Sequence, residues 1–198
     1  MSNGQMASLE DRYFIYERQT VTVDDFESSG YVLDVGGGGE GIIGILKGGE
    51  VVAIDVRRSE LEEAPGGPLK IVADARDLPF LDETFKTATA FFSLMYLKSS
   101  PDYQEVFAEV FRVLEPGGRF LVWDARITRP AETEKPSYVI LLRVRVNGRE
   151  IETGYGQPWP RDAHEPAFYV ARADEAGFEI AAREEDGQLF FLELQKPR

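Results

Sequence analysis

A glycine-rich turn is the sequence feature that is most able to bind a ligand. Residues 34–41 read DVGGGGEG, follow an apolar segment that ends at Val35, and precede a helical pattern that begins at Ile42. Glycines let a backbone approach a ligand closely where a strand meets the start of a helix. Asp55 ends the next apolar segment about 20 residues after Gly36, a spacing typical of an acid that binds ribose hydroxyls. The pattern predicts a nucleoside-containing cofactor.

The charges beside this turn distinguish between two cofactors. Asp34 precedes the first glycine and Glu40 lies where the helix begins. The pyrophosphate of a nicotinamide dinucleotide would be repelled by these carboxylates. S-adenosylmethionine has no phosphate and carries a sulfonium and an ammonium group, so the residues favour it. A nicotinamide-dependent NAD(P) oxidoreductase and a protein that binds S-adenosylmethionine without turnover stay open as alternatives.

The elements that must position these residues form an alternating pattern. Short β-branched runs at 31–35, 51–55 and 69–74 alternate with helical stretches, which indicates βα units and a parallel sheet. Residues 87–95 and 119–125 read as the fourth and fifth strands. A helix from Pro101 to about Leu114 is expected between them. The order predicts an α/β, Rossmann-like, doubly wound fold.

The C-terminal third indicates antiparallel strands. Asn147-Gly148 lies between two alternating runs and is typical of a hairpin turn. A helix over 166–176 precedes two terminal strands, 178–184 and 188–194, which would complete a seven-stranded sheet with an antiparallel last strand. The hairpin belongs to an inserted segment, 127–160. This segment is expected either to cover the acceptor as a lid, or to extend the sheet or pair two subunits.

Four segments, in order, resemble the class I S-adenosylmethionine-dependent methyltransferases. They are the glycine-rich 31–41, the strand 51–55, the segment 71–85 and the helix-loop-strand 111–124. The resemblance is strong over about 30–125 and extends in outline over 165–196. It implies that S-adenosylmethionine is the cofactor, bound by Asp34, Gly36, Gly38, Asp55, Asp74, Ala75 and Phe91. Asp55 would accept the ribose hydroxyls, Asp74 and the Ala75 amide would hold the adenine, and Leu78 and Phe80 would pack nearby.

The sequence departs from the family where a base is often found. Glu40 replaces the usual third glycine, and residues 93–96 read SLMY without the histidine that many relatives carry after the fourth strand. No general base is evident, so positioning of donor and acceptor would have to drive transfer, and no catalytic residue is assigned. The acceptor-side candidates are Tyr13, Tyr16 and Tyr96. His164, in a proline-containing loop, is interpreted as a surface residue.

Composition excludes several classes of function. The chain has 198 residues, no cysteine, one histidine and a formal net charge of −13. These numbers argue against disulfides, metal sites and general nucleic-acid binding. No apolar run approaches the ~20 residues of a membrane span, and no secretory signal is visible. We expect one cytoplasmic methyltransferase domain over 1–198, with an N-terminal arm over 1–29 of undecided structure, that acts on a small molecule as a monomer or homodimer.

Overall fold

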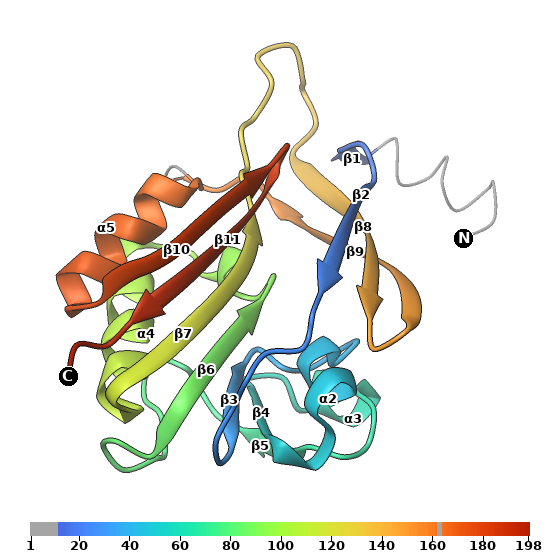
Figure 1. The fold of residues 1–198 in the computed structure, drawn as a ribbon. Helices are drawn as coiled ribbons and strands as arrows, with labels where there is room; N and C mark the ends of the chain where they lie inside the picture. Colours follow the sequence, from blue (N-terminus) through green and yellow to red (C-terminus); the bar gives the residue numbers. More distant parts are fainter. Residues whose placement is uncertain (1–11, 162–163) are drawn as a thin grey trace.

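The computed structural model describes residues 12–161 and 164–198, and its main feature is a seven-stranded sheet (Figure 1). The strands lie in the order β10-β11-β7-β6-β3-β4-β5, and β11 is antiparallel to both of its neighbours. The remaining neighbours pair in parallel. This confirms the predicted sheet. The strands are β3 (Val32–Val35), β4 (Val51–Asp55), β5 (Leu69–Val72), β6 (Phe85–Phe91), β7 (Leu114–Ala125), β10 (Glu179–Asp186) and β11 (Leu189–Gln195).

Helices cover opposite faces of this sheet because alternate residues of its central strands are apolar on both faces. Leu33 and Val35 pack in one apolar cluster with α4 (Ser100–Val113) and α5 (Pro166–Ala176). Val32 packs in a second cluster with α2 (Ile42–Lys47) and α3 (Arg58–Glu63). The short 3-10 helices η1 (Gly48–Glu50) and η2 (Leu94–Tyr96) follow α2 and β6. The fold is therefore doubly wound, as predicted.

The N-terminal arm and the inserted hairpin together form a second sheet. Strands β1 (Tyr13–Ile15) and β2 (Gln19–Val23) pair in parallel with β8 (Ser137–Val146), and β9 (Arg149–Pro158) pairs with β8 from the other side. The described part of the arm thus contains two short strands, while its residues 1–11 lie outside the described part. Because β8 and β9 lie in a separate sheet, the interpretation that the hairpin extends the main sheet is wrong.

The hairpin forms for the predicted local reason and is held by apolar packing. Asn147 and Gly148 have φ values of 47° and 71°, as the two central residues of a type I′ turn require. Alternate residues of β8 are buried against the cluster of α2, namely Tyr138, Ile140, Leu142 and Val144. The second sheet therefore shares a core with the glycine-turn side of the main sheet.

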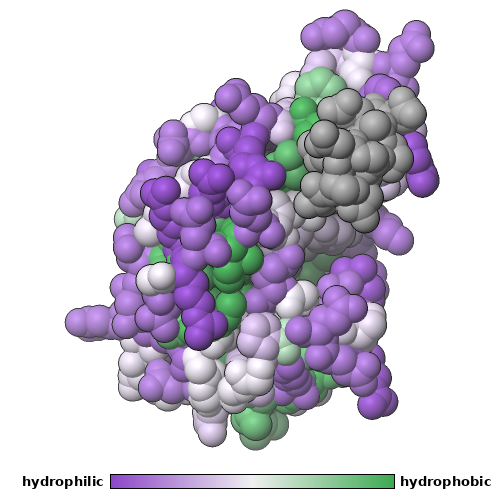
Figure 2. Space-filling view, turned by 90° about the vertical axis from the view of Figure 1, so that its right-hand side faces the viewer, coloured by the Kyte–Doolittle hydropathy of each residue, from purple (hydrophilic) through white to green (hydrophobic). Residues whose placement is uncertain are grey.

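The surface is mostly hydrophilic on the side turned to the viewer in Figure 2, where apolar residues show in a hollow between hydrophilic ones. A hydrophilic surface is expected for this chain, because 29% of its residues are charged. None of the helices in residues 12–161 and 164–198 is long and apolar enough to cross a bilayer.

Candidate functional site

A cavity of about 480 Å³ lies at the carboxyl ends of β3, β4 and β6. Ligands enter doubly wound sheets at this edge, where neighbouring crossovers run to opposite faces. Five acidic and two basic residues line the cavity: Asp34, Glu40, Asp55, Glu60, Asp74, Arg57 and Lys98. The cavity holds all seven cofactor-binding residues predicted from the sequence. Its excess of acids suits a cationic ligand.

The glycines of the turn are required by the protein's own packing. Gly36 has a φ of 73°, and a Cβ there would lie 2.3 Å from Cβ of Ser93. A Cβ on Gly38 would lie 2.5 Å from Cβ of Glu60 and 2.8 Å from Oδ2 of Asp55. The turn thus fits between the end of β6 and α3, which brings Asp55 beside it.

Asp34 is a buried carboxyl at the floor of the cavity, with 2% of its surface exposed. The Thr89 hydroxyl donates to its Oδ1 at 2.8 Å. Burial raises the pKa of Asp34 to about 7, the Thr89 hydrogen bond opposes this rise, and the charge of Asp55 adds to it. A bound cation would favour the ionised form of this group.

We expect Asp34→Asn to gain stability relative to the wild type as pH rises. The folded wild type keeps a proton on Asp34 up to a pKa of about 7, whereas an unfolded aspartate loses it near ~3.9. Wild-type stability therefore falls as pH rises through this window, and the asparagine lacks this loss. Urea unfolding measures the free energy of unfolding of each protein at pH 5 and at pH 8. The value for the variant minus the value for the wild type should be about 2 to 3 kcal/mol larger at pH 8 than at pH 5. A constant difference would contradict the buried carboxyl.

Asp55 ends β4 with its carboxylate facing the glycine turn. The backbone amide of Arg57 donates to its Oδ1 at 2.8 Å, which fixes the carboxylate in a local turn. A carboxylate has about four acceptor sites, so this bond leaves room for ligand hydroxyl donors. Val56 follows in the cavity wall with 61% of its surface exposed, and offers an apolar face to the same ligand.

Asp74 and Ala75 lie in the cavity wall after β5, but the Asp74 carboxylate has a strong internal partner. The Arg76 guanidinium donates to both of its oxygens, at 3.0 Å to Oδ1 and 2.6 Å to Oδ2. These hydrogen bonds hold the pKa of Asp74 below its usual range. Arg76 also pairs with Asp102 at 2.7 Å, which ties this wall to α4. An adenine contact by Asp74 stays a prediction.

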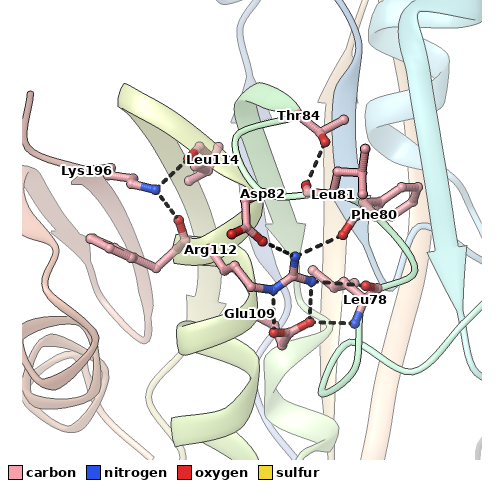
Figure 3. A network of polar contacts seen from close by, with 10 residues as sticks. Leu78, Phe80, Leu81, Asp82, Thr84, Glu109, Arg112, Leu114 and Lys196 are labelled. Carbon is pink, nitrogen blue, oxygen red and sulfur yellow. Dashed lines mark hydrogen bonds and ion pairs between the residues drawn. The ribbon is translucent and has the colours of Figure 1, made fainter.

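The segment after Asp74 is fixed by Arg112 of α4 (Figure 3). Its guanidinium donates to the carbonyls of Leu78 and Phe80, at 3.1 and 2.9 Å, and pairs with Glu109 and Asp82. Glu109 in turn accepts the Leu78 amide at 2.7 Å. Leu78 and Phe80 pack in the apolar cluster under the wall and are absent from the lining of the cavity in the described chain.

The end of β6 brings aromatic side chains to the cavity. Phe91 and Phe92 both line it, and Phe92 has a φ of 48°. A positive φ is uncommon for a bulky residue, and such strain occurs often at functional sites. The amide of Phe92 donates to the Trp123 carbonyl at 2.8 Å, and the next residue, Ser93, donates to the Val35 carbonyl at 2.6 Å. These bonds hold the strained residue in place.

The structure brings one of the three predicted acceptor-side tyrosines to the cavity. Tyr96 lines the cavity with 37% of its surface exposed. Burial of its hydroxyl raises the pKa of Tyr96 to about 12. Tyr16 instead packs among Phe14, Tyr138 and Trp159, and its hydroxyl donates to the Thr128 carbonyl at 2.7 Å. Tyr13 lies in β1, and neither it nor Tyr16 is among the described residues that line the cavity.

Two polar residues of β9 reach the glycine turn, and sequence reasoning missed them. The Tyr155 hydroxyl donates to Oε2 of Glu40 at 3.1 Å, and the Thr153 hydroxyl donates to its Oε1. Tyr155 also lines the cavity. Thr153 and Tyr155 are separated by one position and therefore lie on the same face of β9. The sequence shows this shared face, but it does not show which part of the protein the face contacts.

His164 is buried, so its interpretation as a surface residue is wrong. It has 3% of its surface exposed and lies between the hydroxyls of Tyr103, 3.1 Å from Nδ1, and Tyr169, 2.8 Å from Nε2. The Tyr169 hydroxyl donates to the buried Asp124 at 2.9 Å, so it accepts from Nε2 of His164. The backbone of His164, which follows the inserted segment, pairs with Ile127 at the start of that segment.

Comparison with known proteins finds similarity to methyltransferases. The model of a methyltransferase domain matches residues 33–122. The chain is 36% identical over 110 residues to the methyltransferase phqN of Penicillium fellutanum, covering 56% of this chain and 30% of that protein. It is 32% identical over 144 residues to the ubiquinone/menaquinone biosynthesis C-methyltransferase UbiE of a Marinomonas strain, covering 66% and 53%. The chain thus spans only part of the length of these curated relatives.

Solved structures agree with this comparison at the level of the fold. An S-adenosylmethionine-dependent methyltransferase from Methanosarcina mazei has a TM-score of 0.61 at 19% identity, with 87% of this chain and 94% of that chain covered. The [4+2]-cyclase SpnF has a TM-score of 0.59 at 18% identity, with 86% and 76% covered. Residues 33–122 are therefore similar to a methyltransferase domain, and the fold is that of solved S-adenosylmethionine-dependent methyltransferases.

Proposed function

We propose that the protein transfers a methyl group from S-adenosylmethionine to a small-molecule acceptor. The observation that carries the proposal is the acid-rich cavity at the carboxyl ends of β3, β4 and β6, with the glycine turn and Asp55 side by side. S-adenosylmethionine supplies a methyl group activated by a sulfonium. Its positive charge and its ribose match the acids of this cavity, whereas a dinucleotide pyrophosphate would be repelled by them.

Different residues of the cavity would bind the adenosine and the methionine parts of this cofactor. Asp55 would accept the ribose hydroxyls, while Asp74 and Ala75 would border the adenine. Asp34, Gly36 and Gly38 would line the methionine part, together with the backbone at Phe91. Asp34 and Asp55 fit a cofactor with both a cationic end and a sugar, since their carboxylates lie near enough for the charge of Asp55 to raise the pKa of Asp34.

The tyrosines near the cavity are unsuited to act as general bases at neutral pH. Burial raises the pKa of both Tyr96 and Tyr155, and the charge of Glu40 raises both further. Their hydroxyls therefore stay protonated. In-line positioning of two reactants supplies about 7 to 11 kcal/mol of a barrier, so positioning is the mechanism that we propose.

The acceptor would lie between the cofactor and the second sheet. Tyr96 and Tyr155 line this part of the cavity, and the inserted segment carries Tyr155. The relative from Marinomonas supports a small-molecule acceptor, because its name specifies ubiquinone and menaquinone biosynthesis. We therefore favour the lid interpretation of the hairpin, and a macromolecular acceptor such as nucleic acid is disfavoured by the net charge of −13.

Two alternatives make different predictions. A nicotinamide-dependent oxidoreductase would place a pyrophosphate at the glycine turn. A non-catalytic S-adenosylmethionine-binding protein would keep the cofactor cavity and lack turnover.

We expect calorimetric titration to show binding of S-adenosylmethionine and S-adenosylhomocysteine, and none of reduced nicotinamide dinucleotides. The reason is the charge of the five acidic residues that line the cavity. Incubation with a panel of acceptors and mass analysis of the products then separates an enzyme from a binding protein. Binding of the dinucleotide alone would refute the proposed function.

A further inference from the structure

Glu40 is a carboxylate in the cavity lining that contacts β9. It occupies the place of the third glycine of the turn, and its oxygens accept the hydroxyls of Thr153 and Tyr155 from β9. Both donors are neutral, and within residues 12–161 and 164–198 Glu40 forms no ion pair with a lysine or arginine. Glu40 is half-buried in the cavity wall. Its negative charge is therefore available to a ligand.

Aromatic residues line the same cavity as this carboxylate in the described chain, among them Phe92, Tyr96 and Tyr155. The rings of Phe92 and Tyr155 stack with centroids 5.7 Å apart and an interplanar angle of 16°, and both residues line the cavity. Tyr96 lines the same region, and the charge of Glu40 contributes to the raised pKa of its hydroxyl. Aromatic rings and a carboxylate are the groups that bind quaternary ammonium ions in proteins.

We propose that Glu40, Tyr96, Tyr155 and Phe92 form an acceptor subsite for a neutral group that becomes positively charged on methylation, an amine nitrogen in the simplest case. This inference rests on the proposed function. An amine acceptor forms the new N–C bond with its lone pair while the C–S bond of the donor breaks, and the electron pair of that bond stays on sulfur. The positive charge thus passes from sulfur to the acceptor nitrogen, whose extra proton leaves to water after the transfer.

The position of Glu40 favours such an acceptor over an anionic one. A carboxylate beside the acceptor atom gains attraction as positive charge develops there, which stabilises the transition state more than the ground state. A phenolate or carboxylate acceptor would instead meet a like charge in a partly desolvated site. An alkene also becomes cationic when it is methylated, so a nearby carboxylate would stabilise its transition state in the same way.

Three probes of one shape test the charge preference directly. Choline is a cation, 3,3-dimethylbutan-1-ol is its neutral carbon isostere, and 3,3-dimethylbutanoate is an anion of nearly the same shape. We expect the wild-type protein, saturated with S-adenosylhomocysteine, to bind choline about tenfold more tightly than the alcohol, and the anion most weakly. NMR titration measures the three dissociation constants.

Two matched variants locate the origin of the preference. Glu40→Gln keeps the size of the side chain and one of its two acceptor oxygens while removing the charge, and should reduce the preference for choline to about twofold or less. Glu60→Gln removes one charge from α3 in the wall of the same cavity, where Glu60 already pairs with Arg57 at 3.3 Å, and should leave most of the preference intact. Equal losses in the two variants would mean that general cavity charge sets the preference and would overturn the subsite.

The outcomes separate this inference from the proposed function. Failure of the wild-type protein to bind S-adenosylhomocysteine refutes the proposed function. Binding of S-adenosylhomocysteine without a preference for choline, or with an unchanged preference in a folded Glu40→Gln variant, refutes the subsite alone. A Glu40→Gln variant that keeps the preference but binds S-adenosylmethionine more weakly would place Glu40 against the donor and would also overturn the subsite. In an acceptor screen, methylation of amines or of alkenes distinguishes the two neutral acceptor classes.

Discussion

Asp55→Ala should weaken binding of S-adenosylmethionine ten- to a hundredfold. The Asp55 carboxylate faces the glycine turn, and one of its oxygens already accepts the Arg57 amide, which holds the carboxylate in place for a ligand. Loss of two hydrogen bonds to a charged acceptor costs about 1.5 to 3 kcal/mol in binding free energy, or ten- to a hundredfold in dissociation constant. Calorimetry of the wild type and the variant measures this difference.

Two further variants make the result specific. Asp55→Asn keeps one acceptor oxygen without the charge, so its affinity should lie between those of the wild type and Asp55→Ala. Glu62→Ala changes an exposed α3 carboxylate that pairs with Arg58 at 2.8 Å, away from the cavity, and should bind as the wild type does. An unchanged dissociation constant in folded Asp55→Ala would place the end of β4 outside the site.

His164→Ala should lower the free energy of unfolding by about 3 kcal/mol. The substitution leaves a cavity the size of the ring and removes a hydrogen-bond partner from the buried hydroxyls of Tyr103 and Tyr169. Tyr169→Phe, which removes one hydroxyl from between His164 and Asp124, should cost about 1 to 3 kcal/mol. Urea unfolding monitored by circular dichroism and fluorescence measures both changes.

An exposed ion pair provides the comparison for this result. Arg183→Ala removes a pair with Glu185 at 2.6 Å on the surface of β10, and should change stability by less than about 1 kcal/mol. If His164→Ala were as mild as Arg183→Ala, His164 would be an exposed residue, as its sequence context had indicated.

The sequence by itself determined the seven-stranded sheet and the location of the cavity that we propose for the cofactor, because both depend on local patterns. Alternation of apolar residues within each strand decides its burial on two faces, and Asn147-Gly148 decides the hairpin turn through local backbone preference. The glycine turn and Asp55 follow successive strands of a parallel sheet, so their meeting at one edge follows from the topology. Resemblance to a family supplied Asp74 and Ala75, which line the same cavity.

Only the tertiary structure decided which surfaces meet across long separations in the sequence. The N-terminal arm became strand because β8 offered its free edge, a partner more than a hundred residues away. The contact of Glu40 with Tyr155 and the burial of His164 between α4, α5 and β7 have the same origin, since each depends on how separate elements pack. The local sequence around a polar loop residue such as His164 does not show whether its side chain faces water or buried hydroxyl and carboxyl groups. Only the packing of the surrounding elements decides between these two environments.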